Sequence, residues 1–182
     1  MDKEIPVSAR ELAQRIWVLC KDFSKEFSES FMPEIKKSGF EINEENALDI
    51  RRGILVMNFW IISEALSAEK SLVDEVHNVW VDYSKNVMKS VTNDEAEIRE
   101  FMLKDRNYLI ERYEKYHNAM KKSDGDVTAA LSMTILEHVF NKGNPDHRFV
   151  DAKLFIPVGI HIYSVLTRVS LYRKGFVIIE NN

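Results

Sequence analysis

Residues 53–66 carry apolar side chains on every side when they are placed on a helix at about 100° per residue. The apolar side chains that point in different directions are Leu55, Phe59 and Leu66, then Ile54, Met57 and Ile61, then Val56 and Trp60. A helix that is apolar all round is buried among other helices or lies in a membrane. The uncharged run ends at Glu64, well short of the roughly 20 residues that a membrane span needs. The pattern therefore predicts a central helix over about residues 43–67, surrounded by the other segments.

The segment before the central helix has a narrow apolar stripe and a charged back, which predicts an amphipathic helix over about residues 8–31. Ser8 and Glu11 form an S-x-x-E capping box at its start, and Pro33 marks its end. Asn43 is a good N-cap for the central helix.

The rest of the chain continues the helical pattern. We expect a break at residues 67–68, although no Gly or Pro marks it, and Thr92 with Glu95 forms a second capping box. The further predicted helices cover about residues 69–91, 92–122, 127–141 and 151 (or 157) to 173, and residues 176–179 are either a short strand or an apolar tail. The sequence thus predicts an all-α fold, a helical bundle of about six helices, with residues 1–182 forming a single domain.

Composition narrows the class of protein. The net charge is −4 and no stretch concentrates Lys and Arg, so we expect no nucleic acid partner. A lone Cys20 cannot form an internal disulfide and the N-terminus has no apolar run typical of a secretory signal, which favours a cytoplasmic location. The uncharged run at residues 154–167 has too few residues for a span. We therefore expect no transmembrane segment, and peripheral membrane contact through the C-terminal segment is a weaker alternative.

Three polar residues fall where the helical core should lie. Asn58 and Glu64 sit on the central helix, and His138 sits on an apolar face of the helix over residues 127–141. A buried carboxylate is costly unless it is paired, so Glu64 needs a partner, for which His138 and Arg112 are candidates. One hypothesis is a ligand-binding pocket with Glu64 and His138 at its floor and the edge of a tyrosine stripe, Tyr108 and Tyr116, beside it. The alternative is a structural hydrogen-bond network, or a Glu64 that simply reaches solvent at the end of its helix.

Two short motifs suggest a divalent metal as a possible cofactor. Asp74-x-x-His77 and Glu114-x-x-His117 each place an acid and a histidine on one side of a helix, as in metal-binding bundles. Both acids, however, lie more than a right angle from the apolar face of their helix, whereas a metal site in the core needs them to point inward. The expectation is that the protein holds no cofactor, with the metal as the alternative.

The leading functional hypothesis is a non-enzymatic protein that binds a protein partner or a second copy of itself. The common catalytic signatures, such as a Gly-rich phosphate loop or G-x-S-x-G, are missing from the sequence. Four apolar residues fall off the main stripes of their helices and are candidates for an interface: Trp17, Val18, Val81 and Met88. Since exposed apolar patches tend to be interfaces and two-fold dimers are the commonest oligomers, a homodimer is the simplest expectation. The alternative is a bundle that binds a small ligand or a metal around Glu64 and His138.

Overall fold

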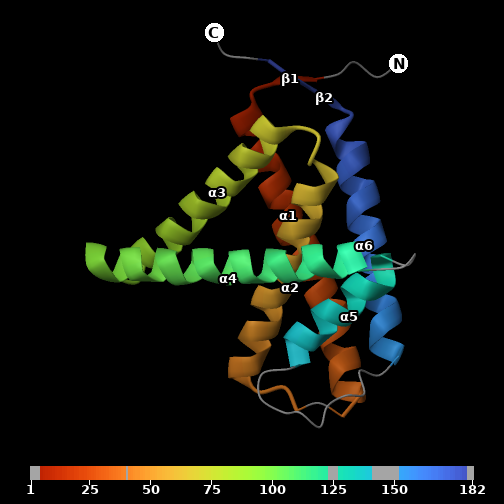
Figure 1. Ribbon diagram of the computed structural model, residues 1–182. Coiled ribbons are helices and arrows are strands. Elements are labelled where there is room, and N and C mark those ends of the chain that lie inside the picture. Colours follow the sequence, from red (N-terminus) through yellow and green to blue (C-terminus); the bar gives the residue numbers. More distant parts are fainter. Residues whose placement is uncertain (1–4, 40, 123–126, 141–151, 180–182) are drawn as a thin grey trace.

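The computed structural model describes residues 5–39, 41–122, 127–140 and 152–179, and within them six helices and two short strands (Figure 1). The elements in chain order are β1 (Ile5–Val7), α1 (Ala9–Lys37), α2 (Glu44–Ala65), α3 (Lys70–Lys89), α4 (Glu95–Lys122), α5 (Val127–Phe140), α6 (Ala152–Arg173) and β2 (Phe176–Ile178). The all-α fold class predicted from the sequence is confirmed, and so is the short extended segment near the C-terminus.

Helix α2 lies in the middle of the bundle, as its pattern predicts. Eight of its residues, seven apolar and one polar, are each at most 2% exposed: Ile54, Val56, Met57, Asn58, Phe59, Trp60, Ile61 and Ile62. These consecutive positions point in all directions around a helix, so α2 must be covered on every side. Helices α1, α4, α5 and α6 all pack against it.

Helix α1 continues through Pro33 and ends at Lys37, so the predicted end near residue 31 is wrong. A proline in a helix interior removes one hydrogen bond to the preceding turn. Phe31 and Ile35, on either side of it, are almost fully buried, and their burial offsets that loss. Ser38 is the C-cap of the helix, and Gly39 follows it with a φ of 88°, a left-handed conformation that suits glycine.

Two of the three predicted N-caps are confirmed. The Ser8 side chain accepts a hydrogen bond from the Glu11 N–H at 3.1 Å, and the Asn43 side chain accepts one from the Asn46 N–H at 2.9 Å. The third is wrong in position, because Asp94 rather than Thr92 caps α4, by accepting from the Ala96 N–H at 2.7 Å. The predicted break at residues 67–68 is confirmed, since α2 ends at Ala65 and α3 begins at Lys70.

Helix α4 crosses the bundle, and its first half extends beyond the other helices in Figure 1. It buries only a few side chains well, and one of them, Asp105, is charged and 5% exposed. Its carboxylate accepts hydrogen bonds from Arg52 of α2 at 2.8 Å and from Trp80 and Ser84 of α3, each at 2.9 Å. A single carboxylate therefore ties α4 to two other helices.

Strands β1 and β2 pair in parallel, with Ile5 opposite Phe176, at one end of the molecule (Figure 1). Arg173, at the end of α6, donates to the Phe176 carbonyl and to the Glu69 carboxylate just before α3. The sequence analysis did not predict β1, because three residues before a helix cap carry no periodicity of their own.

Candidate functional site

The buried polar residue Asn58 joins three helices. It is 0% exposed, its Nδ2 donates to Ser24 Oγ of α1 at 2.9 Å, and its Oδ1 lies 2.7 Å from His161 Nε2 of α6. The His161 ring stacks on Phe27 with the ring centroids 4.0 Å apart. Both polar atoms of the Asn58 side chain therefore have a partner. This fits the alternative from the sequence, in which the buried polar residues form a structural hydrogen-bond network.

His161 is held in its neutral form at neutral pH. Desolvation, with a smaller contribution from the nearby Arg168 cation, lowers the pKa of His161 to about 4. Because the Asn58 oxygen can only accept, the proton of the neutral ring is assigned to Nε2. The sequence did not single out His161 as the partner of Asn58, although it lies on the flank of the buried face of α6.

Glu64 does not join Asn58. Its Oε1 lies 3.8 Å from Nδ1 of His117, and its side chain is 32% exposed, because it is one residue from the end of α2 and reaches solvent. The side chain of His138 lies outside the described residues. For Glu64 the structure therefore agrees with the alternative in which this side chain reaches solvent at the end of its helix, and Arg112 is not its ion-pair partner in the part of the chain that the structure describes.

The remaining candidate ligand-binding residues pack against aromatic rings. The guanidinium carbons of Arg52 and Arg112 lie 4.2 and 5.0 Å from the centre of the Tyr108 ring. Tyr116 is 1% exposed, its ring centroid lies 5.3 Å from that of Trp60, and burial raises its pKa. These contacts hold α4 on α2, and they lie apart from the Asn58 network.

The two acid–histidine motifs do not form a metal centre in the described residues, where no three His, Cys, Asp or Glu side chains converge. Asp74 and Glu114 are exposed, as their helical positions predict. His77 Nδ1 lies 2.8 Å from the Val73 carbonyl of its own helix, and His117 faces Glu64 instead of Glu114. The donor set present here does not fit a divalent metal, which needs several converging ligands.

Of the four residues predicted to form an interface, Trp17 is not on the surface, so the prediction for it is wrong. It is 5% exposed and lies among the rings of Phe59, Trp80 and Tyr83, because α3 covers that side of α1. Val18 and Val81 are half exposed, and Met88 is half-buried.

Val81 is next to Asp82, which together with Glu75 of α3 pairs with Arg10 of α1. Two other large side chains of α3, Tyr83 and Val87, are 40% and 42% exposed. The interface role of Val18 and Val81 stays a prediction.

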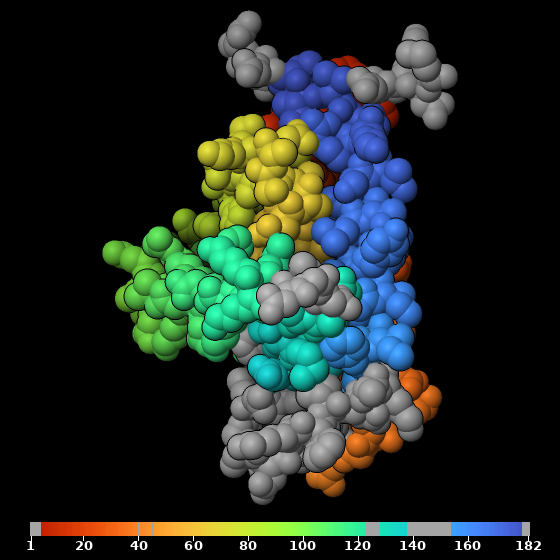
Figure 2. Space-filling view, turned by 45° about the vertical axis from the view of Figure 1, so that its right-hand side comes forward, coloured from red at the N-terminus to blue at the C-terminus, as the bar shows by residue number. Residues whose placement is uncertain are grey.

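Helix α6 exposes a larger apolar surface that the sequence analysis missed. We call it the α6 stripe: Ile156 (62% exposed), Ile160 (65%), Tyr163 (71%) and Leu171 (62%), with the exposed Thr167 between the last two. The opposite face of the same helix is packed into the core through Leu154, Val158, Ile162, Val165 and Val169. Figure 2 shows α6 in blue running along the surface for much of the length of the molecule.

By length and composition, Leu154–Arg173 is the one helix of the described residues that could cross a membrane, with a mean hydropathy of 1.5. It is longer than the uncharged run of the sequence because apolar and neutral residues continue around Arg168. The core helix of a soluble protein can have the same length and composition.

No family model matches the chain, and comparisons with curated proteins and with solved structures gave no significant match either.

Proposed function

We propose that this chain is a non-enzymatic helical protein that works by protein–protein interaction, and that a second copy of the chain binds to its helix α6. The observation that carries the proposal is the α6 stripe, whose four large apolar side chains are 62–71% exposed on one helix face. A contiguous apolar strip of this kind marks an interaction site more often than scattered apolar residues do.

The spacing of the α6 stripe favours a second copy as the partner. In an antiparallel pair of α6 helices with the two-fold axis at residues 163–164, Ile156 lies opposite Leu171 of the other copy. Ile160 then lies opposite Thr167, and the large Tyr163 opposite the small Ser164. A two-fold interface requires a surface that is complementary to itself, since a residue i that contacts residue j of the other copy is matched by a residue j that contacts residue i.

Charge does not oppose such a pair. Residues 154–167 of α6 carry no charged side chain, and Arg168 beside the stripe is already paired with Glu26 of α1, with Nη1 and Oε2 3.4 Å apart. Two copies of the stripe would therefore meet without like charges in the centre of the contact.

A membrane is a less favourable partner for the same helix. A spanning α6 would have to leave the core, exposing Leu154 and Val169, and break the His161–Asn58 and Arg173–Glu69 hydrogen bonds. Surface binding favours a helix with Lys and Arg beside its apolar face, but the basic Arg168 is paired with an acid.

The test is the mass of the protein in solution, measured by light scattering and native mass spectrometry, for wild type, Ile160→Glu and Val81→Glu. Both substitutions place an acid at an exposed apolar position, but only Ile160 belongs to the α6 stripe. We expect a wild-type dimer, a monomeric Ile160→Glu protein and a dimeric Val81→Glu protein. Because one helix per subunit is a small contact, the dimer should dissociate at micromolar concentrations, so the measurement covers about 1–200 µM.

A wild-type protein that stays monomeric over this range would overturn the homodimer. Sedimentation with neutral and anionic vesicles is measured on the same three samples. If the wild type binds vesicles as a monomer and Ile160→Glu does not, the stripe is a membrane contact and the proposal is wrong.

A further inference from the structure

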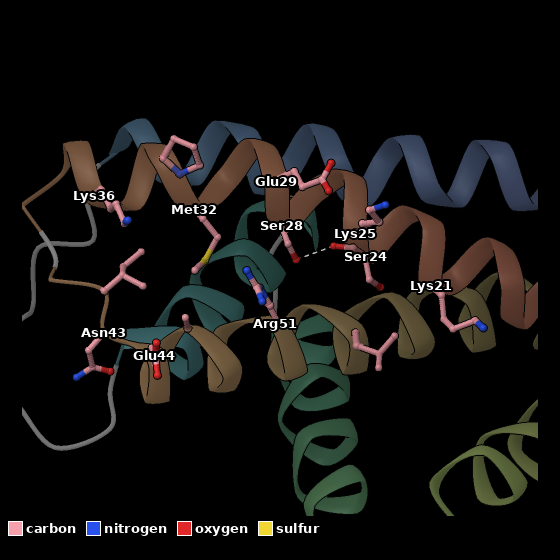
Figure 3. Close-up of a pocket in the computed structure, with 14 residues that line it drawn as sticks. Lys21, Ser24, Lys25, Ser28, Glu29, Met32, Lys36, Asn43, Glu44 and Arg51 are labelled. Carbon is pink, nitrogen blue, oxygen red and sulfur yellow. Dashed lines mark hydrogen bonds between the residues drawn. The ribbon is translucent and has the colours of Figure 1, made fainter. Parts of the chain in front are cut away.

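A groove separates the second half of α1 from the first half of α2, with a cavity volume of about 830 Å³ (Figure 3). This volume is in the range of about 300–1,000 Å³ that is typical of small-molecule sites. Among the described residues, none of α6 lines the groove, so it is separate from the α6 stripe.

The groove has more cations than acids. Lys21, Lys25 and Lys36 of α1 and Arg51 of α2 line it, along with the acids Glu29 and Glu44. Figure 3 shows Lys36 and Arg51 directed from opposite helices into the space between them.

Neither Lys36 nor Arg51 forms an ion pair with a described residue. Both side chains are exposed, so each is available to an anionic group that enters the groove. The charge pattern therefore points to an anionic group of a ligand.

The inner wall of the groove is unsuited to an anion. The Ser24 hydroxyl donates to the Cys20 carbonyl at 2.7 Å and the Ser28 hydroxyl donates to the Ser24 carbonyl at 2.6 Å. A hydroxyl has one hydrogen to donate, so neither serine can donate to a bound anion. The anionic group must therefore contact the cations near the opening.

Apolar side chains make up the rest of the wall. Met32 lies between Lys36 and Arg51 in Figure 3, and Ile42, Ala47 and Leu55 also line the groove. Inorganic phosphate would leave this surface in water, whereas an alkyl chain would cover it.

We propose that the groove between α1 and α2 binds an amphiphilic anion, an alkyl chain that ends in one carboxylate. The carboxylate contacts Arg51 and Lys36, and the chain lies on Met32 and Leu55. Arginine suits this role because its planar guanidinium can donate two parallel hydrogen bonds to a carboxylate.

The test is calorimetric titration of the full chain with three probes. Sodium decanoate has both the chain and the carboxylate, sodium butyrate has the carboxylate with a short chain, and decyltrimethylammonium has the chain with a cation. We expect decanoate to bind one site per chain, more weakly as salt is raised, and the other two probes to bind at least about tenfold more weakly.

Three variants locate the site. Arg51→Gln should weaken decanoate binding about fivefold by removing the charged donor, and Met32→Gln should weaken it by making the wall polar at nearly constant length. Arg99→Gln should bind decanoate as the wild type does, because Arg99 is an exposed arginine of α4, outside the groove lining, that donates to the Glu95 carbonyl of its own helix.

Equal binding of decanoate and decyltrimethylammonium, or equal binding by Arg51→Gln and Arg99→Gln, would overturn the proposal, and so would the absence of decanoate binding at millimolar concentrations. Circular dichroism on each variant excludes loss of fold as the reason for weaker binding. The titration is repeated on Ile160→Glu, so that failure of the α6 dimer and failure of the groove site give different results.

Discussion

Two polar side chains buried in this helical core each have partners from two other helices. Asn58 contacts Ser24 and His161, and Asp105 accepts from Arg52, Trp80 and Ser84. A buried polar group with its partners in place is nearly neutral for stability, but losing one partner costs the desolvation of what remains. These residues therefore fix how the helices are aligned, which apolar contacts alone do less sharply.

His161 should make the stability of the protein depend on pH. Its pKa is about 4 in the folded protein and about 6.5 when unfolded, so between these values the unfolded chain binds a proton that the folded protein does not. The free energy of unfolding should therefore fall as the pH is lowered from about 6.5, by up to about 1.4 kcal/mol per pH unit from this group. Urea unfolding from pH 7.5 to 5 measures the slope.

His161→Gln should reduce that slope, because glutamine does not titrate and its amide can still donate to Asn58. The matched control is His117→Gln on α4, where the His117 side chain is 51% exposed. This variant should keep most of the wild-type slope. An unchanged slope in His161→Gln would show that other groups cause the pH dependence.

Helix α4 is attached to α2 and α3 through a buried charged residue, Asp105. Asp105 lies in the same helical stripe as Phe101, Tyr108 and Leu109, at spacings of four, three and four residues. The sequence therefore carried a signal for its burial. Periodicity alone, however, does not show that Trp80 and Ser84 of α3 supply the donors.

Asp105→Ala should lower the free energy of unfolding by about 2–4 kcal/mol, because Arg52 and the Trp80 indole lose a buried acceptor. Asp82→Ala is the matched control, since Asp82 is also an acid paired with an arginine but is 58% exposed, and it should cost at most about 1 kcal/mol. Urea unfolding at pH 7.5 compares the two. Equal costs would mean that the Asp105 contacts add no more than a surface ion pair.

The helices themselves could be predicted because their signals are local. Ser8 and Asn43 cap the helices that they were predicted to cap, and the apolar run of α2 is buried all round. The errors arise where tertiary packing overrides a local rule. Pro33 is a local stop signal, but the burial of Phe31 and Ile35 keeps α1 helical beyond it.

At the scale of the whole molecule, the sequence could not say which surface is left open. Trp17 and Ile160 are both apolar residues on helices, yet α3 covers the first and no described element covers the second. Helix α6 is apolar on both faces, so its periodicity does not distinguish the face in the core from the face in solvent. Only the arrangement of the other helices decides this.

The proposed two-fold contact fixes which positions of two α6 helices meet, and single cysteines can test this register. Tyr163→Cys should form an intermolecular disulfide with itself, because residue 163 lies beside the axis. Ile156→Cys alone should not, since its counterpart lies about 22 Å further along the helix, at 1.5 Å per residue. Mixing Ile156→Cys with Leu171→Cys should restore the disulfide, because the contact places these positions opposite each other.

Cys20 is buried and its thiol pKa is raised, so the native cysteine should not react. Non-reducing electrophoresis after mild oxidation separates the cases. Efficient self-linkage of Ile156→Cys would show a parallel or random contact, and the antiparallel dimer would be wrong.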